Sequence, residues 1–202
     1  MNIRFWRCAL VVASAGWLLA APAVAGEIRL TVEPGDLWKS VQNGTVVAMA
    51  PEERREFTVP GTLFAAPLTI EPAADPARAT VEQALGDGYD ANRAGDAARL
   101  AATFVAAERA EVLEFFADAE MLKQNSDLFR RLTDYRLEGT IDHAGLTLAI
   151  VAYDIPDHGP SRMVIPLAQE GGGYYTTNAL SADDRFGEIL AAIRKGQFAA
   201  AP

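Results

Sequence analysis

Hydrophobic residues recur at helical spacing in the middle of the chain and alternate with polar residues further on. Val81, Leu85 and Tyr89 are four residues apart, which places them on one face of an amphipathic helix. Asp75 and Pro76 precede this run and are typical of a helix start, because Asp can cap free N–H groups and Pro fits the first helical position. The pattern therefore predicts a helix that begins at Asp75-Pro76.

A break in the helical pattern follows at Ala94-Gly95-Asp96. Glycine at the end of a helical run is typical of a left-handed C-terminal residue, and Asp96 is suited to capping a second helix. Helical spacing continues to residue 132, with Ser126 as the expected start of the last segment. We interpret the break as a corner that turns two helices toward one core.

The alternating pattern after Asp134 predicts an antiparallel sheet. Short turns that contain Gly or Pro separate four stretches with strand character, residues 135–143, 146–153, 161–169 and 174–178. A last helical pattern ends at Gly196, with Ser181 or Asp183 as its cap. Helices followed by successive hairpins predict an α+β fold: N-terminal helices packed on a curved antiparallel sheet, with a further helix at the C-terminal end.

The segment before the helices has a different composition. Residues 26–74 are irregular, and the prolines at 60, 67 and 72 are too close together for a central strand. Phe57, Leu63 and Ile70 favour packing of this segment onto the main domain, and a partner-binding arm is the alternative. The expected organisation is a signal peptide at 1–25, a Pro-rich extension at 26–74, a helix-on-sheet domain at 75–196 and a tail at 197–202.

The first 25 residues have the composition of a secretory signal peptide. Arg4 and Arg7 form a basic start, an apolar run extends from Ala9 to Ala21, and small residues precede a predicted cleavage after Ala25. A single membrane anchor is the alternative, but this run is shorter than the roughly 20 residues that span a bilayer. We therefore expect a periplasmic or secreted protein, with no stable membrane insertion after cleavage.

Charge and cysteine content limit the classes of partner and of site. The net charge of −9 becomes two units more negative when Arg4 and Arg7 are lost with the signal peptide. Nucleic acids and anionic lipids need positive charge at the contact, so neither is an expected partner. Cys8 is the single cysteine and lies in the predicted signal peptide, which excludes disulfides and thiolate metal sites from the mature chain.

Two short motifs carry a resemblance to a known superfamily. "ANRAGDAARLAATF", residues 91–104, resembles the first helix pair of the nuclear transport factor two-like superfamily, which includes the SnoaL-like polyketide cyclases. "QEGGGYYTTNAL", residues 169–180, is similar to the penultimate hairpin and last strand of those proteins, with Tyr174 where many relatives have Trp. The resemblance implies a conical pocket between a bent sheet and its helices, and it implies a homodimer. A cystatin-like or other helix-on-sheet fold is the main competitor.

The strand residues expected inside such a cone are apolar. They suit an apolar ligand or form a filled core, and they are Leu146, Leu148, Ile150, Met163, Ile165 and Leu167. Tyrosines near the strand ends can place hydroxyl groups at the mouth of the cone, although aromatic residues in strands more often serve packing. The candidate ligand-binding residues are Tyr153, Arg162, Met163 and Tyr174.

Acid–base chemistry has few candidates. His143 and His158 are the two histidines, and both fall in predicted turns. An enzyme would use Asp134 and Tyr135 at the start of the first sheet strand, or Asp142 and His143 at its end. Adjacent residues of a strand point to opposite faces, which separates Asp142 from His143 unless the turn bends the chain. The sequence has no phosphate-binding, zinc-protease or nucleophile-elbow motif, so we expect no metal site and no cofactor.

These features favour an exported, non-enzymatic binding or interaction module. It would engage a cell-envelope protein or a small apolar molecule through the cone or through the N-terminal segment. The alternative is a SnoaL-like enzyme that catalyses proton transfer on a small hydrophobic substrate.

Overall fold

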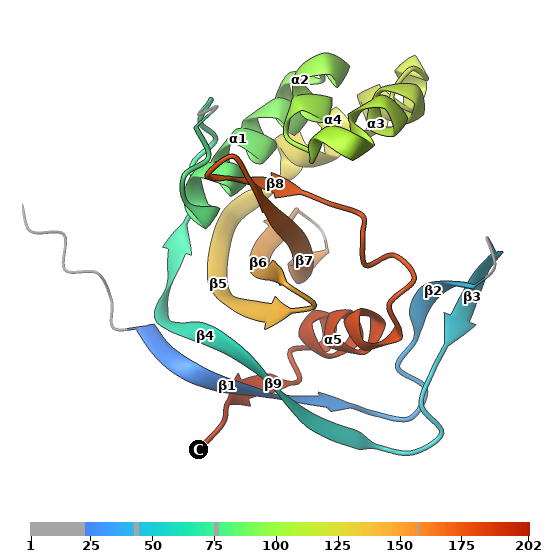
Figure 1. The fold of residues 1–202 in the computed structure, drawn as a ribbon, viewed down its shortest axis with the longest axis vertical. Coiled ribbons are helices and arrows are strands. Elements are labelled where there is room, and N and C mark those ends of the chain that lie inside the picture. The colour runs from blue at the N-terminus through green and yellow to red at the C-terminus, as the bar shows by residue number, and fades with distance from the viewer. Residues whose placement is uncertain (1–22, 43–44, 75–76, 157) are drawn as a thin grey trace, which may run out of the picture.

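Seven strands form a curved antiparallel sheet that wraps around the C-terminal helix without closing on itself (Figure 1). The computed structural model describes residues 23–42, 45–74, 77–156 and 158–202. The strands of this sheet are β1 (Ala23–Val32), β4 (Arg55–Thr69), β5 (Thr133–His143), β6 (Leu146–Ile155), β7 (Gly159–Glu170), β8 (Gly173–Thr176) and β9 (Phe198–Ala200). Their order is β8-β7-β6-β5-β4-β1-β9, so β8 and β9 are the two edges. The predicted α+β class is confirmed.

Strands β5 to β8 form the meander that the sequence predicts, since each pairs antiparallel with the next. Ala144 and Gly145 connect β5 to β6 with positive φ angles of 51° and 77°. Two successive positive φ angles are typical of the tight hairpin turns whose twist matches that of the flanking strands. Gly171 and Gly172 make the corresponding turn before β8, with φ angles of 58° and 86°.

The Pro-rich segment enters the same sheet instead of packing onto it. β4 pairs with β5, and β1 pairs with β4, so residues 26–74 contribute two strands to the sheet. Pairing of β4 with β5 is limited to residues 61–63 and 68–69, with a bulge between them. Pro60 and Pro67 fall outside these paired positions, so neither has to donate a hydrogen bond to β5. The expectation that prolines exclude a central strand is corrected accordingly.

The structure bears differently on the predicted signal peptide and on the predicted C-terminal tail. Of the predicted signal peptide, residues 1–22 lie outside the described residues, and residues 23–25 begin β1. The predicted tail at 197–202 contributes β9, which pairs with β1 on the side away from β4. The C-terminal end is therefore part of the sheet.

Helix α1 (Val81–Ala94) is shorter than predicted at its start and ends where expected. Asp75 and Pro76 lie outside the described residues, and residues 77–80 are not helical. The cap is Thr80, whose hydroxyl accepts a hydrogen bond from the Gln83 N–H while the Gln83 side chain accepts one from the Thr80 N–H. Gly95 has a φ angle of 68°, which confirms the predicted left-handed end.

Three further helices follow the corner at Gly95. Asp96 caps α2 (Ala97–Ala102), as predicted, by accepting hydrogen bonds from the N–H groups of residues 98 and 99. A 3-10 turn, η1 (Ala106–Glu108), leads into α3 (Arg109–Phe115), and Asp118 caps α4 (Ala119–Arg131). Ser126 lies inside α4 and its hydroxyl donates to the Lys123 carbonyl, so the predicted helix restart at Ser126 is wrong.

The sheet separates two hydrophobic cores. Helix α5 (Asp184–Lys195) lies in the hollow of the sheet, where Ile189 and Ile193 pack with Leu148 and Ile150. The opposite face packs against α1 and the end of α4, and it presents Leu137, Ala149, Val151 and Leu167. Successive residues of β6 therefore face different cores, as the pleat of a strand requires.

The presence of two cores corrects the expectation that the six apolar strand residues all line a single cone. Met163, Ile165 and Leu167 pack on the α1 side, whereas Leu146, Leu148 and Ile150 pack on the α5 side.

A separate hairpin covers α5 from outside the main sheet. It consists of β2 (Trp38–Gln42) and β3 (Thr45–Met49). Trp38 is buried and packs so closely on Gly187 of α5 that an added Cβ would lie 2.0 Å from the Trp38 Cδ1 atom. Only glycine fits at this contact.

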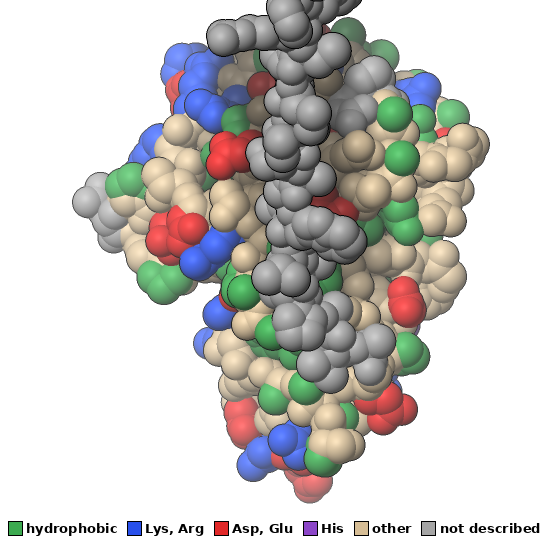
Figure 2. Space-filling model, turned by 90° about the vertical axis from the view of Figure 1, so that its left-hand side faces the viewer, with side chains coloured by type: hydrophobic (Ala, Val, Ile, Leu, Met, Phe, Trp, Pro, Cys, Tyr) green, Lys and Arg blue, Asp and Glu red, His purple; other side chains and the backbone are tan. Residues whose placement is uncertain are grey.

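Charged side chains of both signs are interspersed over the visible part of the face in Figure 2, with hydrophobic side chains between them. The larger exposed hydrophobic side chains on the described helices are on α3 and α4: Leu113, Phe115, Met121 and Leu128. No helix within the described ranges is long and apolar enough to cross a membrane.

Candidate ligand-binding site

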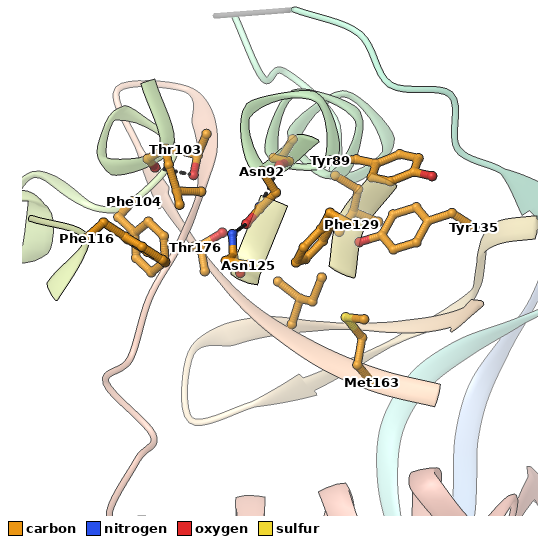
Figure 3. Close-up of a pocket in the computed structure, with 15 residues that line it drawn as sticks. Tyr89, Asn92, Thr103, Phe104, Phe116, Asn125, Phe129, Tyr135, Met163 and Thr176 are labelled. Carbon is orange, nitrogen blue, oxygen red and sulfur yellow. Dashed lines mark hydrogen bonds between the residues drawn. The ribbon is translucent and has the colours of Figure 1, made fainter. Parts of the chain in front are cut away.

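A pocket of about 260 Å³ lies between the α1–α4 helices and the sheet, on the face opposite α5 (Figure 3). Helix α1 forms one wall through Ala84, Gly88 and Asn92, which share a face because they are four residues apart. A Cβ placed on Gly88 would meet no atom within 4 Å. The missing side chain at Gly88 therefore contributes to the open space beside α1.

The segment between α2 and α3 forms a second wall through Thr103 and Phe104. Backbone hydrogen bonds tie this segment to the edge strand β8. Val105 N–H donates to the Thr176 carbonyl at 3.0 Å, and Thr176 N–H donates to the Thr103 carbonyl at 2.9 Å. The wall is therefore fixed to the sheet by its main chain.

Two carboxylates fix the same segment from its outer side. Glu108 accepts hydrogen bonds from the Thr177 hydroxyl at 2.6 Å and from the Asn178 N–H at 2.8 Å. Glu170 accepts one from the Ala106 N–H at 3.1 Å. Both carboxylates are used in structural contacts outside the pocket lining.

Helix α4 and the residue that follows α3 complete the helical side of the pocket. Asn125 and Phe129 project from α4, and Phe116 lies between α3 and α4. Phe116 also lines two neighbouring hollows of about 330 and 300 Å³ on the α3–α4 side. Phe116 therefore stands between the pocket and the outer surface of α3 and α4.

The sheet side of the pocket is formed by Tyr135 of β5 and by Met163 and Ile165 of β7. Met163 and Ile165 are two residues apart, so both point to the same face of the sheet. Their side chains pack in the same core as Tyr89 and Tyr135. Thr176 of the edge strand β8 also lines the pocket, so the sheet side is apolar apart from the hydroxyl groups of Tyr135 and Thr176.

Two asparagines bond to each other across the helices. Asn125 Nδ2 donates to Asn92 Oδ1 at 2.7 Å, and Asn92 Nδ2 donates to the Gly88 carbonyl at 2.7 Å (Figure 3). The amide of Asn92 is thereby held in place, and Asn125 retains its carbonyl oxygen as an acceptor at the pocket wall.

Tyr135 is held rigidly, but its hydroxyl makes no hydrogen bond with any other described residue. The residue is 3% exposed, and its ring stacks on Tyr89 with centroids 4.5 Å apart. The Tyr135 hydroxyl points toward Phe129 and Met163, into the pocket (Figure 3). Burial raises the pKa of Tyr135 well above the ordinary tyrosine value, with smaller contributions from Tyr89 and Tyr153. The phenol is therefore neutral.

The pocket has no charged lining. Among the described residues that line it there is no Asp, Glu, His, Lys or Arg. The described parts of the chain also contain no group of three or more His, Cys, Asp or Glu side chains placed to hold a metal ion. The arrangement can hold a neutral, largely apolar molecule and offer it a few hydrogen bonds.

The four residues considered for catalysis are not brought together. Tyr135 lines the pocket, whereas Asp134 is exposed, has a positive φ of 54° and forms an ion pair with Arg136 at 2.9 Å. His143 lies at the far end of β5 with its Nε2 atom 3.2 Å from the Asp183 carboxylate, and Asp142 beside it is exposed. The eight residue steps from Asp134 to Asp142 would extend over roughly 26 Å of strand.

The four candidate ligand-binding residues are also divided. Met163 lines the pocket, and Tyr153 and Tyr174 pack against the same core without lining it. Arg162 faces the other side of the sheet, where its guanidinium bonds to both carboxylate oxygens of Glu138 at 2.6 and 3.2 Å.

Sequence reasoning missed the helical half of the pocket. Asn92 falls inside the 91–104 motif but was not singled out, Asn125 lies outside both motifs, and their pairing joins residues 33 positions apart. One signal was available: the four-residue spacing of Ala84, Gly88 and Asn92 predicts a helix face with a gap at Gly88.

No protein-family model matches the chain, and no curated protein or solved structure matches it. Membership of the nuclear transport factor two-like superfamily therefore stays a prediction from two short motifs.

Proposed function

We propose that the protein is an exported, non-enzymatic binding module that holds a small apolar ligand in the pocket between α1, α4 and the sheet. The main support for this proposal is the pocket lining, which is apolar with a few neutral polar groups and has no charged side chain among the described residues. Pockets of this composition commonly bind small molecules. Export to the periplasm rests on the signal-like composition of residues 1–25.

The pocket volume limits the ligand size. An apolar cavity of about 150 Å³ holds benzene, and the present pocket measures about 260 Å³. A substituted single ring or a short branched hydrocarbon chain suits this space. A long lipid chain would have to extend past Phe116 toward α3 and α4.

Binding is favoured over proton transfer for a physical reason. A general acid or base has to lie within hydrogen-bond reach of the substrate and to have a pKa near the working pH. Tyr89 and Tyr135 are the titratable side chains among the described lining residues. Tyr89 donates its proton to the Leu132 carbonyl at 3.0 Å, and the raised pKa of Tyr135 opposes loss of its proton.

Filling the pocket tests the proposal. In the variant Gly88→Leu the new side chain would occupy the open space beside α1. We expect calorimetric titration with the uncharged probe α-methylstyrene to give binding to the wild type and at least about tenfold weaker binding to Gly88→Leu. The control Ala94→Leu places the same side chain at an exposed position of the same helix and should bind like the wild type. Equal affinity of the wild type and Gly88→Leu would contradict the proposal.

A partner protein is the second candidate, because α3 and α4 expose an apolar surface. Leu113, Phe115, Met121 and Leu128 are 43%, 57%, 40% and 43% exposed. Glu111 and Glu114 on α3 are exposed and have no ion pair with another described residue. An envelope protein that contacted this surface would present an apolar patch flanked by Lys or Arg.

Matched surface variants test this second candidate. Phe115→Ser removes an aromatic ring from the α3–α4 surface, and Leu37→Ser removes an exposed apolar side chain elsewhere. We expect cross-linking in an envelope fraction to give one product that is lost with Phe115→Ser, kept with Leu37→Ser and weakened by salt. A product that is insensitive to both variants would contradict docking at α3 and α4.

A further inference from the structure

We infer that the pocket selects ligands that carry a carbonyl group and that the Tyr135 hydroxyl recognises this group by donating a hydrogen bond. The inference rests on the proposed function, because it names the ligand class for the same pocket.

The first support is a hydroxyl group at the pocket wall that bonds to no other described residue. Tyr135 is 3% exposed, and its hydroxyl has no hydrogen-bond partner among the described residues. Among the described residues, the fully buried side-chain atoms without a partner are Trp38 Nε1, Arg136 Nε and Asp154 Oδ1. The Tyr135 oxygen is not one of them, so it borders the open space of the pocket. The hydroxyl points into the pocket, where a bound molecule would reach it (Figure 3).

The second support is the contrast with Tyr89. The two rings stack 4.5 Å apart, with 24° between their planes. Tyr89 donates its hydroxyl proton to the Leu132 carbonyl, and this hydroxyl points away from the pocket (Figure 3). Packing alone would be served equally by phenylalanine at position 135. The hydroxyl at position 135 thus has no structural role in the described chain, and the stacked ring fixes its direction.

The chemical class follows from what the pocket offers. A neutral phenol at the floor donates to a carbonyl oxygen, and the surrounding Phe129 and Met163 suit the apolar group attached to that carbonyl. A carboxylate would enter without a countercharge, because no Lys or Arg occurs in the described lining, and burial of an unpaired charge is costly. Ketones, aldehydes and esters of small apolar molecules therefore fit better than acids.

The ligand orientation is also determined by these groups. The carbonyl end lies at Tyr135, and the apolar body extends toward Phe104 and Phe116 at the other end of the pocket (Figure 3).

A pair of probes of nearly equal shape isolates the carbonyl contribution. Acetophenone has an oxygen where α-methylstyrene has a methylene group, and otherwise the two molecules share one skeleton. The affinity ratio of ketone to alkene is measured by calorimetric titration for the wild type, Tyr135→Phe and Tyr89→Phe. Comparison of ratios between variants cancels the different hydration of the two probes.

We expect the ketone-to-alkene ratio to be about fivefold higher in the wild type than in Tyr135→Phe, as one neutral hydrogen bond gives. Tyr89→Phe should keep the wild-type ratio, because its hydroxyl bonds to Leu132 and not to the ligand. The infrared C=O band of bound acetophenone should lie at lower frequency in the wild type than in Tyr135→Phe.

The outcomes separate this inference from the proposed function. If both probes bind with the same ratio in the wild type and in Tyr135→Phe, and the C=O band does not move, carbonyl recognition is refuted and the pocket remains a binding site. If neither probe binds the wild type, the proposed function fails as well. If Tyr89→Phe loses the preference together with Tyr135→Phe, the ring stack and not the Tyr135 hydroxyl is responsible, and the inference is overturned.

Discussion

At the scale of single residues, Asp183 links the end of the sheet to the start of α5. Its carboxylate accepts a hydrogen bond from the Phe186 N–H at 2.6 Å and lies 3.2 Å from His143 Nε2. Burial acts to raise the pKa of Asp183, but the hydrogen bonds from Phe186 and His143 lower it below its usual value of 3.8. The ionised carboxylate is therefore favoured by the folded state.

The charge of Asp183 makes a pH-dependent contribution to stability. A lowered folded-state pKa stabilises the fold above the unfolded value of 3.8, and this stabilisation is lost as the pH falls through the folded-state pKa. The variant Asp183→Asn keeps a good helix cap without the charge. We expect urea unfolding to show a less stable Asp183→Asn at pH 6, with a difference that shrinks steadily below pH 3.8. A difference that is constant or increases on acidification would refute this account of Asp183.

At the scale of elements, two helical glycines have opposite roles. Gly88 of α1 has open space where a Cβ would lie, whereas Gly187 of α5 is covered by Trp38. Alanine is favoured over glycine in a helix, so Gly88→Ala should raise the free energy of unfolding by roughly 0.5–1 kcal/mol.

The reverse result is expected at Gly187. An added methyl group would lie 2.0 Å from a ring carbon of Trp38, which forces the β2–β3 hairpin or α5 to shift. Gly187→Ala should therefore lower the free energy of unfolding by about 1–3 kcal/mol in chemical denaturation, despite the gain in helix propensity. Stabilisation by both substitutions would show that Trp38 does not pack on α5 as described.

Elements with local signals were predictable from the sequence. Gly95 and Asp96 determine a helix end and a helix start through their own backbone and side chain, and the turns at Gly145 and Gly172 require positive φ angles. Ser126 misled the prediction, because a serine resembles a cap in sequence but bonds within α4. The properties of single residues were therefore sufficient to predict the helix corner at Gly95 and the hairpin turns at Gly145 and Gly172.

Pairings between distant segments were not predictable in the same way. β4 contains Pro60 and Pro67, and its place between β1 and β5 depends on partners that are distant in sequence. The pocket has the same difficulty: Tyr135 and Met163 were among the candidates, but Asn92 and Asn125 meet only through the packing of α1 on α4. Contacts between residues that are distant in sequence cannot be predicted from a short motif.

At the scale of the whole molecule, the N-terminal segment is integral to the sheet. Ile28, Leu30 and Val32 of β1 are 1%, 0% and 0% exposed, and they belong to the core around α5. Removal of residues 26–74 would uncover this core and leave β5 without its β4 neighbour.

We therefore expect a chain that lacks residues 26–74 to lose cooperative folding. Thermal unfolding followed by circular dichroism should lose its sharp transition, and backbone amides of β5 should exchange rapidly with deuterium. A cooperative transition close to that of the full chain would mean that the segment is an accessory extension.

We propose that the space between α1, α4 and the sheet binds a small apolar molecule. Met163 lines this pocket, whereas Met49 and Met121 lie outside it, so these three of the four methionines report on different regions. The direct measurement is an NMR titration of protein labelled at the methionine methyl carbons with α-methylstyrene. We predict a saturable shift of the Met163 methyl signal with little change at Met49 and Met121. An unchanged Met163 signal, or a shift confined to Met121 on the outer surface of α4, would contradict the claim.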